Sequence, residues 1–138
     1  MKLPEFTTDE EVMFFDTDCA GVMHNIAYLR MIETCRTHLG TNMGMDFKVM
    51  GATQLYPAVL RTEIDYRLPA KLGDKIQIIG KLSKIERVRF WCDFTITRPS
   101  DNKILVTCRQ SLALVQMNGD KPAKPTRLPQ EWKDNWAT

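Results

Sequence analysis

The hydrophobic positions of the chain follow two different periods, and the change between them separates a helical part from a sheet-forming part. From Asn25 onward apolar residues recur every three or four positions, which is the spacing of one face of an α-helix. These positions are Ile26, Leu29, Ile32, Cys35, Leu39 and Met43. The stripe predicts a helix of about five turns that begins at Asn25, a favourable N-cap residue type, and frays at Gly40 and Gly44.

After Pro57 the period changes to two, which is typical of strands with one buried face. The clearest alternation runs from Val88 to Ile96. We predict strands over residues 10–15, 59–67, 75–86, 88–96 and 104–116. One short strand, one long helix and four longer strands indicate an α+β fold in which a single helix covers one antiparallel sheet.

The last part of the chain has a different composition. Residues 117–138 contain Pro122, Pro125 and Pro129, so we expect a C-terminal tail that does not join the core sheet. The 138 residues have the size of a single domain, 1–138. A sheet covered by one helix leaves apolar surface exposed, so we also expect an oligomer.

Charge narrows the range of partners. The formal net charge is +2, far from the concentrated positive charge of nucleic-acid-binding proteins, so no nucleic-acid partner is expected. Residues 71–109 nevertheless hold nine Lys and Arg against four Asp and Glu. That basic segment could attract a phosphate-bearing ligand, although the polar outer positions of strands would explain it as well.

The four cysteines indicate a reducing environment. Cys19, Cys35, Cys92 and Cys108 form no Cys-x-x-Cys pair and have no histidine at a metal-ligand spacing. The chain starts without an apolar signal core, and no run approaches the roughly 18 apolar residues of a membrane span. We therefore expect a cytoplasmic protein with neither a metal nor a cofactor.

The loop before the predicted helix carries the most promising chemistry. Asp16, Asp18, Gly21 and His24 lie directly before the helix start, where free backbone N–H groups can polarise a carbonyl. Asp18 could act as a general base or as a nucleophile, or it could simply brace the loop. Asp16 is expected to be the bracing carboxylate, because two carboxylates on a tight loop raise each other's pKa.

The same residues resemble a known family. Residues 16–22 (Asp-Thr-Asp-Cys-Ala-Gly-Val), followed by Asn25, Tyr28 and Glu33, are similar to the signature of the hot-dog-fold acyl-CoA thioesterases of the hydroxybenzoyl-CoA thioesterase-like, or YbgC-type, group. The segment from Arg61 to Asp74 looks like the second recurrent block of that family. The resemblance implies a helix wrapped by a curved antiparallel sheet of about five strands. It also implies a homodimer with a continuous sheet, often a homotetramer, with active sites at the dimer interface.

The resemblance also implies residue roles. It makes Asp18 the catalytic residue and places the oxyanion-binding amide near Asn25. Gly21, His24, Tyr28 and Glu33 are the further candidates for substrate binding, with Tyr28 lining a pocket and Glu33 a buried, paired carboxylate. Three basic residues, Lys84, Arg87 and Arg89, are candidates for contacts with coenzyme A phosphates. Cys19 is expected to pack rather than to react, because no partner base activates it.

The function that these residues favour is hydrolysis of an acyl-CoA thioester. A thioester carried by an acyl carrier protein is an alternative substrate. Two other classes remain open, namely a non-catalytic acyl-binding module and a hot-dog lyase or dehydratase. A serine-hydrolase triad is disfavoured because the chain contains no Gly-x-Ser-x-Gly and has only His24 and His38. Phe47, Met50, Phe90 and Trp91 could close the acyl pocket or fill the core.

Overall fold

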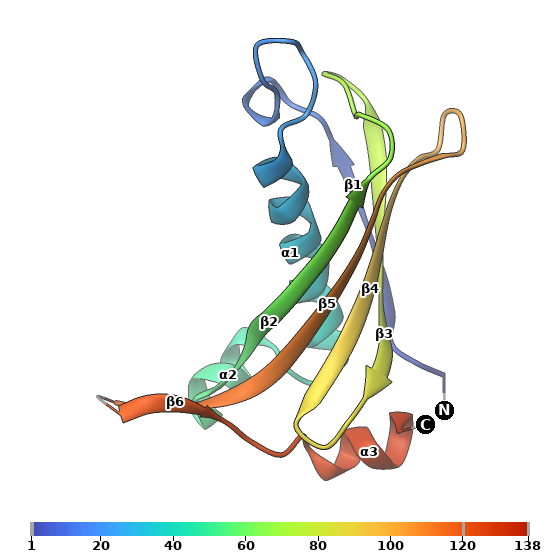
Figure 1. Ribbon diagram of the computed structural model, residues 1–138. Helices are drawn as coiled ribbons and strands as arrows, with labels where there is room; N and C mark the ends of the chain where they lie inside the picture. The colour runs from blue at the N-terminus through green and yellow to red at the C-terminus, as the bar shows by residue number, and fades with distance from the viewer. Residues whose placement is uncertain (1, 120, 138) are drawn as a thin grey trace.

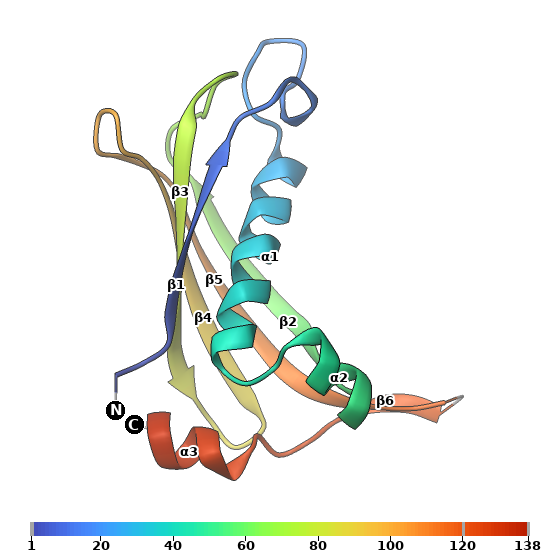
Figure 2. The ribbon, with the colours of Figure 1, turned by 180° about the vertical axis from the view of Figure 1, so that it is seen from behind.

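A single curved antiparallel sheet with one long helix packed across its face makes up most of the protein (Figures 1 and 2). The computed structural model describes residues 2–119 and 121–137. The strands are β1 (Glu5–Glu11), β2 (Leu55–Tyr66), β3 (Lys75–Ile85), β4 (Arg89–Arg98), β5 (Lys103–Asn118) and β6 (Lys121–Pro125), and the helices are α1 (Asn25–Asn42), α2 (Phe47–Thr53) and α3 (Gln130–Trp136). The sheet order is β1-β3-β4-β5-β2, with β6 added to the end of β5. The predicted α+β hot-dog architecture is confirmed.

The core lies between α1 and the inward faces of β3, β4 and β5. The helix contributes Met31, Ile32 and Cys35, all fully buried, and it begins at Asn25 as predicted. The helix and the sheet come very close at Gly80 of β3, where a Cβ would lie 2.9 Å from the Cys35 Sγ and 2.8 Å from the Phe94 Cε1. A residue without a side chain therefore lets α1 settle onto the sheet here.

Two predicted strands need new boundaries, and one helix was missed. The first strand is β1 at Glu5–Glu11, and residues 14–16 form a 3-10 turn instead of the end of a strand. β2 begins at Leu55, four residues before the predicted strand, because an edge strand needs no alternating pattern where its side chains are only half-buried. The short helix α2 was not predicted. It begins where the Asp46 carboxylate accepts the Val49 N–H at 2.8 Å, but its seven residues are too few for a clear period.

The prediction that the tail stays off the sheet was wrong. β6 pairs with β5, and α3 covers the end of the core with Trp132, which is only 3% exposed. The Trp132 Nε1 donates to the Met43 carbonyl at 3.0 Å, and its ring lies edge-on to Phe90. Proline is tolerated in β6 because an edge strand leaves some N–H groups unused.

One face of the chain remains apolar and open. Ile26 and Leu29, which belong to the predicted apolar stripe, are 69% and 38% exposed, and Phe14 and Phe15 before the Asp18 loop are exposed as well. Within the described residues, the twelve-residue strand β2 pairs with β5 alone, so its other edge is free. β2 itself also exposes Val59 and Leu60, and a long free edge with exposed apolar side chains is typical of a surface that another chain covers.

Candidate active site

Asp18 lies on a tight loop beside the start of α1. Its backbone N–H donates to the Val22 carbonyl at 2.9 Å, and its Oδ1 accepts the N–H of Ala20 at 2.8 Å and of Val22 at 3.4 Å. Gly21 adopts φ +76°, a left-handed conformation that favours glycine. The carboxylate is exposed, and no residue in the described ranges hydrogen-bonds its Oδ2. The loop thus fixes one oxygen of Asp18 and leaves the other open to a substrate or water.

Asp16 is the bracing carboxylate, as expected. Its side chain is buried, its Oδ2 accepts the Met13 N–H at 3.0 Å, and its Oδ1 lies 3.8 Å from the Arg30 Nη2. Its backbone carbonyl accepts the N–H of His24 at 2.9 Å. Asp16 therefore connects the two ends of the loop and has no open oxygen facing the helix start.

His24 caps α1. Its Nδ1 accepts the Ala27 N–H at 3.1 Å, and its Nε2 lies 3.2 Å from the Phe15 carbonyl. These two contacts together require a neutral ring with its proton on Nε2, so both ring nitrogens are engaged. Across residues 2–119, the N–H groups of Asn25 and Ile26 have no acceptor. They are the amides available to a developing oxyanion.

We expect His24→Ala to lower the stability of the protein by about 1 kcal/mol, the usual cost of losing an N-cap side chain. His24→Asn should retain most of the stability because asparagine is itself a good N-cap residue. Thermal unfolding of the two variants and the wild type would test this role. Equal melting temperatures for His24→Ala and the wild type would contradict it.

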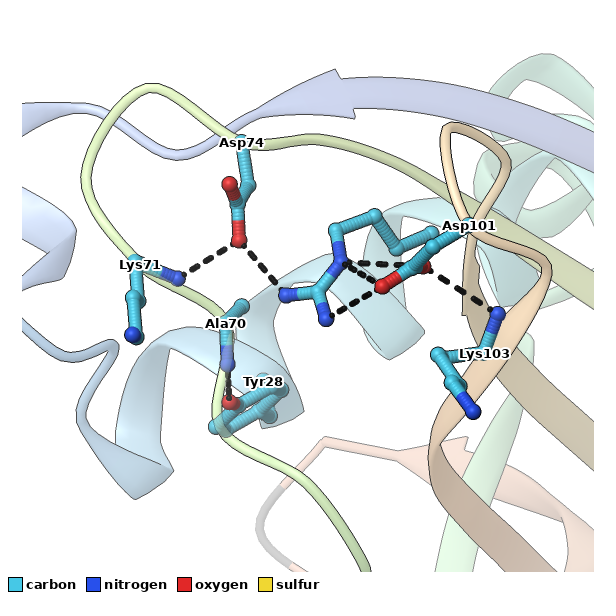
Figure 3. A network of polar contacts seen from close by, with 7 residues as sticks. Tyr28, Ala70, Lys71, Asp74, Asp101 and Lys103 are labelled. Carbon is cyan, nitrogen blue, oxygen red and sulfur yellow. Dashed lines mark hydrogen bonds and ion pairs between the residues drawn. The ribbon is translucent and has the colours of Figure 1, made fainter.

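A second turn, residues 70–74, is hydrogen-bonded to the Asp18 loop through the Leu72 N–H and the Gly21 carbonyl. Figure 3 shows the bonds of this turn to Tyr28 and between Lys71 and Asp74. The Tyr28 hydroxyl accepts the Ala70 N–H at 2.9 Å, and the Ala70 carbonyl accepts the Met23 N–H at 2.8 Å. Asp74 accepts the Lys71 N–H at 2.9 Å and an N–H of Arg98 at 3.0 Å. Burial raises the pKa of Tyr28, so its hydroxyl stays protonated. The loop, the turn and the helix start are one connected unit.

Two separate pockets are lined by residues of α1 and β2, one near each end of α1. The first, which we call the amide pocket, has a volume of about 290 Å³. Its lining includes Asn25 and Tyr28 of α1 and Tyr66, Arg67 and Leu68 at the end of β2. It adjoins the free amides of the helix start and contains one basic side chain, Arg67.

The second, which we call the methionine pocket, lies near the C-terminal end of α1 and has a volume of about 200 Å³. It is bounded by the second half of α1, by α2, by Pro57 at the start of β2 and by the inward face of β4 and β5. Its apolar lining includes Met43, Met45, Phe47, Met50 and Phe90. Of the four bulky residues that could close a pocket or fill the core, Phe47, Met50 and Phe90 line this pocket, whereas Trp91 lies on the outer face of the sheet against Arg109.

A polar connection beside the methionine pocket links α1 to β5 and β2. The Arg36 Nη1 donates to the Gln110 Oε1 at 2.7 Å, and the Gln110 Nε2 donates to the Thr62 Oγ1 at 3.2 Å. Glu33 lies 3.5 Å from the Arg36 Nη2, but its side chain is 68% exposed. Glu33 is therefore paired but not buried, contrary to the sequence-based expectation. Burial lowers the pKa of Arg36, although its guanidinium remains charged.

The predicted coenzyme A contacts lie far from Asp18 within one chain. Lys84, Arg87 and Arg89 surround the hairpin between β3 and β4, while the Asp18 loop contacts the segment that leads into the start of β3. The eleven residues of β3 separate the two ends by roughly 35 Å. A single chain does not bring these basic residues together with the catalytic loop.

The cysteines offer no nucleophile in the core. Burial raises the pKa of Cys92 to about 12 and that of Cys108 to about 11, and it also raises the pKa of Cys35. These thiols stay protonated at neutral pH. Cys19 is exposed, which corrects the expectation that it packs. Among the described residues, no group of three or more Cys, His, Asp and Glu side chains could hold a metal ion, and no helix is long and apolar enough to cross a membrane.

Sequence reasoning missed Arg36, Gly40, Arg67 and Gln110. A signal for the first two was present, because Asn25, Leu29, Arg36 and Gly40 follow helical spacing along one flank of α1. Three residues of that flank, Asn25, Arg36 and Gly40, line the two pockets. Sequence reasoning did not single out this flank because the apolar stripe of the same helix is more regular.

Comparison with known proteins gives a consistent result. Residues 12–135 match the sequence profile of the Thioesterase-like superfamily. A 1,4-dihydroxy-2-naphthoyl-CoA hydrolase of Synechocystis sp. (strain ATCC 27184 / PCC 6803 / Kazusa) is 24% identical over 93% of this chain and 91% of its own length.

Comparison with solved structures also finds thioesterases. A probable thioesterase from Bartonella henselae is 26% identical, with a TM-score of 0.80 over 91% of this chain and 99% of its own. A variant 4-hydroxybenzoyl-CoA thioesterase, in complex with 4-hydroxybenzoyl-CoA, is 12% identical with a TM-score of 0.86 over 95% and 97% of the two chains. The latter likeness concerns the fold alone.

Proposed function

This chain belongs to the Thioesterase-like superfamily, and from that premise we propose that it hydrolyses an acyl-CoA thioester to the free acid and coenzyme A, with Asp18 as the catalytic carboxylate. The observation that carries the proposal is the open Oδ2 of Asp18 on a loop that ends at the two free amides of α1. A carboxylate beside preorganised N–H donors is suited to acyl transfer.

The carboxylate of Asp18 and the two free N–H groups suggest a course for the reaction. The N–H groups of Asn25 and Ile26 bind the thioester carbonyl oxygen as it gains negative charge. Asp18 either takes a proton from the attacking water or attacks the carbonyl carbon itself and forms an anhydride that water then opens. In both routes the carbon–sulfur bond breaks, and coenzyme A leaves as a thiolate that is protonated to the thiol. The amide pocket receives the part of the thioester next to this carbonyl.

The relatives guide the choice of substrates for the first assay. Some are named for aromatic acyl-CoAs, including 1,4-dihydroxy-2-naphthoyl-CoA and 4-hydroxybenzoyl-CoA. We would measure thiol release from aromatic, short-chain and long-chain acyl-CoAs with the purified wild type. Turnover of any of them supports the proposal. Binding without turnover of the whole panel would favour an acyl-binding module instead.

We also propose that the protein forms an oligomer. The free edge of β2 and the exposed Ile26, Leu29, Phe14 and Phe15 support a homodimer joined along β2, and pairs of dimers would form a homotetramer. Lys84, Arg87 and Arg89 could then contact coenzyme A phosphates only from another subunit. The four free cysteines support a reducing, cytoplasmic location.

We expect sedimentation velocity at micromolar concentration to show a species of at least twice the chain mass of 15.9 kDa. A single monomeric species that hydrolyses thioesters at the full rate would contradict the proposed assembly.

A further inference from the structure

One arginine outside the pockets described above joins two turns of the chain. The guanidinium of Arg98, at the end of β4, donates from Nη1 to the Asp74 Oδ2 at 3.0 Å and from Nη2 to the Asp101 Oδ2 at 2.9 Å. Figure 3 shows the Asp74 and Asp101 carboxylates reaching from two different turns toward this guanidinium. The side chain of Arg98 is only 19% exposed, so the guanidinium has little freedom to move.

An arginine suits this position better than a lysine. The Nε and Nη2 of Arg98 form a fork with the two oxygens of Asp101, at 3.1 Å and 2.9 Å, and this leaves Nη1 to reach Asp74. A lysine ammonium has no such planar fork. Hydrogen bonds to Asp101 and Asp74 raise the pKa of Arg98, and the bond from Arg98 holds the pKa of Asp101 below its usual range. Arg98 is therefore a charged link between the 70–74 turn and the hairpin from β4 to β5.

Asp74 carries this link into the 70–74 turn. The oxygen that accepts from Arg98, Oδ2, also accepts the Lys71 N–H at 2.9 Å, and the Asp74 N–H donates to the Lys71 carbonyl at 2.9 Å. One oxygen thus closes the turn and binds the guanidinium. Without Arg98, the partly exposed carboxylate of Asp74 could rotate toward water and release the Lys71 N–H.

The turn is joined to the Asp18 loop by backbone hydrogen bonds. The Leu72 N–H donates to the Gly21 carbonyl at 3.2 Å, and the Met23 N–H donates at 2.8 Å to the carbonyl that begins the turn. Between these two bonds lies Val22, whose carbonyl accepts the Asp18 N–H at 2.9 Å and whose N–H donates to the Asp18 Oδ1 at 3.4 Å. A displacement of the turn therefore reaches the Asp18 carboxylate through two hydrogen-bonded steps.

We propose that Arg98 is a positioning residue for the catalytic loop, because it holds Asp74, fixes the 70–74 turn and through that turn keeps the open oxygen of Asp18 at the helix start. The inference rests on the proposed role of Asp18 in thioester hydrolysis. Arg98 itself takes no part in the reaction. It acts through geometry alone, and a misplacement of about 1 Å at a reacting group can lower a rate about 100-fold.

Removal of the guanidinium tests the effect on turnover. We expect Arg98→Met, which keeps an unbranched stem without donors, to lower kcat about 10- to 100-fold. KM and the affinity for a non-hydrolysable thioether analogue of the substrate should each change less than about threefold. Arg98→Lys keeps the charge but not the fork, so its kcat should lie between those of Arg98→Met and the wild type.

A matched control is available on the outer face of the sheet. The Arg109 Nε lies 3.5 Å from the Asp93 Oδ1, so Arg109→Met also removes an arginine–aspartate pair, but one without a hydrogen bond to the 70–74 turn. Its kcat should stay within about threefold of the wild type. An equal loss of kcat in Arg109→Met and Arg98→Met would overturn the inference.

A combination with Asp18→Asn separates positioning from a merely structural role. In that background Arg98→Met should lower kcat less than about twofold further, because no catalytic carboxylate remains to be positioned. An arginine that only stabilises the fold would lower the activity by the same factor in both backgrounds. A loss as large as in the wild-type background would therefore overturn the inference.

Amide hydrogen exchange gives a test that does not depend on turnover. The N–H groups of Asp18, Met23 and Leu72 should exchange about 10-fold faster in Arg98→Met than in Arg109→Met, at a temperature where circular dichroism shows both variants to be folded. Arg98→Lys gives the same comparison if Arg98→Met does not fold. Exchange at the wild-type rate would overturn the inference whatever the activity. Faster exchange in a protein whose wild type hydrolyses no thioester would support the link from Arg98 to the loop and remove the proposed function alone.

Discussion

The Asp18→Asn variant is expected to hydrolyse acyl-CoA thioesters about 10²- to 10⁴-fold more slowly than the wild type, with little change in substrate affinity. Asparagine has the shape of aspartate but can neither accept a proton from water nor attack a carbonyl. Its side-chain oxygen can still accept the N–H groups of Ala20 and Val22 that hold Asp18 Oδ1. The loop should therefore keep its conformation, and the loss should fall on kcat.

The measurement is thiol release under saturating substrate, with binding of the thioether analogue measured separately. Asp134→Asn on α3 is a matched control, since this exposed aspartate lies outside the catalytic loop. Asp16→Asn gives a second comparison. Because Asp16 is buried and braces the loop, its change should lower the melting temperature together with the activity. Full turnover by Asp18→Asn would remove Asp18 from the proposed mechanism.

Regular periods and local loop chemistry explain what sequence reasoning predicted well. α1 begins at Asn25 because the apolar stripe and the polar residues before it agree on the same boundary. β3 and β4 alternate because one face of each is buried. β5 departs from the predicted alternation at both ends, since Ile104 is 45% exposed beside the buried Leu105, and residues 110–114 are all buried. The exposed, partly open carboxylate of Asp18 likewise depends on a short local segment, residues 16–22.

Contacts between distant segments explain most of what was missed. Arg36 and Gln110 are 74 positions apart and meet only because α1 crosses β5, and no local pattern records that crossing. The burial of Trp132 against Phe90 fixes α3, although the surrounding segment reads as a polar tail. Ile26 and Leu29 fit the helical stripe but stay exposed in one chain. Their exposure is one of the observations that support the proposed homodimer.

Changes at Gly80 should have the largest effect on stability, because this position determines how closely α1 approaches the sheet. A Cβ would stand 2.8 Å from the Phe94 Cε1 and 2.9 Å from the Cys35 Sγ, closer than real side chains allow, and both neighbours are fully buried. Overpacking of this kind costs about 1–3 kcal/mol and occasionally more. We expect Gly80→Ala to fall within that range and Gly80→Val to exceed it or to prevent folding.

Thermal unfolding of Gly80→Ala, with Gly51→Ala as the control in open space, would test this expectation directly. Each kcal/mol should lower the melting temperature by roughly 2–8 °C for a domain of this size. Adding Cys35→Ala to Gly80→Ala removes one of the two close contacts and should recover part of the loss relative to Cys35→Ala alone. The ring of Phe94 remains in place, so recovery should be incomplete.

Because α1 also carries the amides of Asn25 and Ile26, a helix pushed off the sheet should lose thioesterase activity at temperatures where the variant is still folded. Unchanged stability in Gly80→Ala would mean that the helix can move away from the sheet without cost, and the rigid placement of the helix start on which the proposed oxyanion site depends would no longer hold.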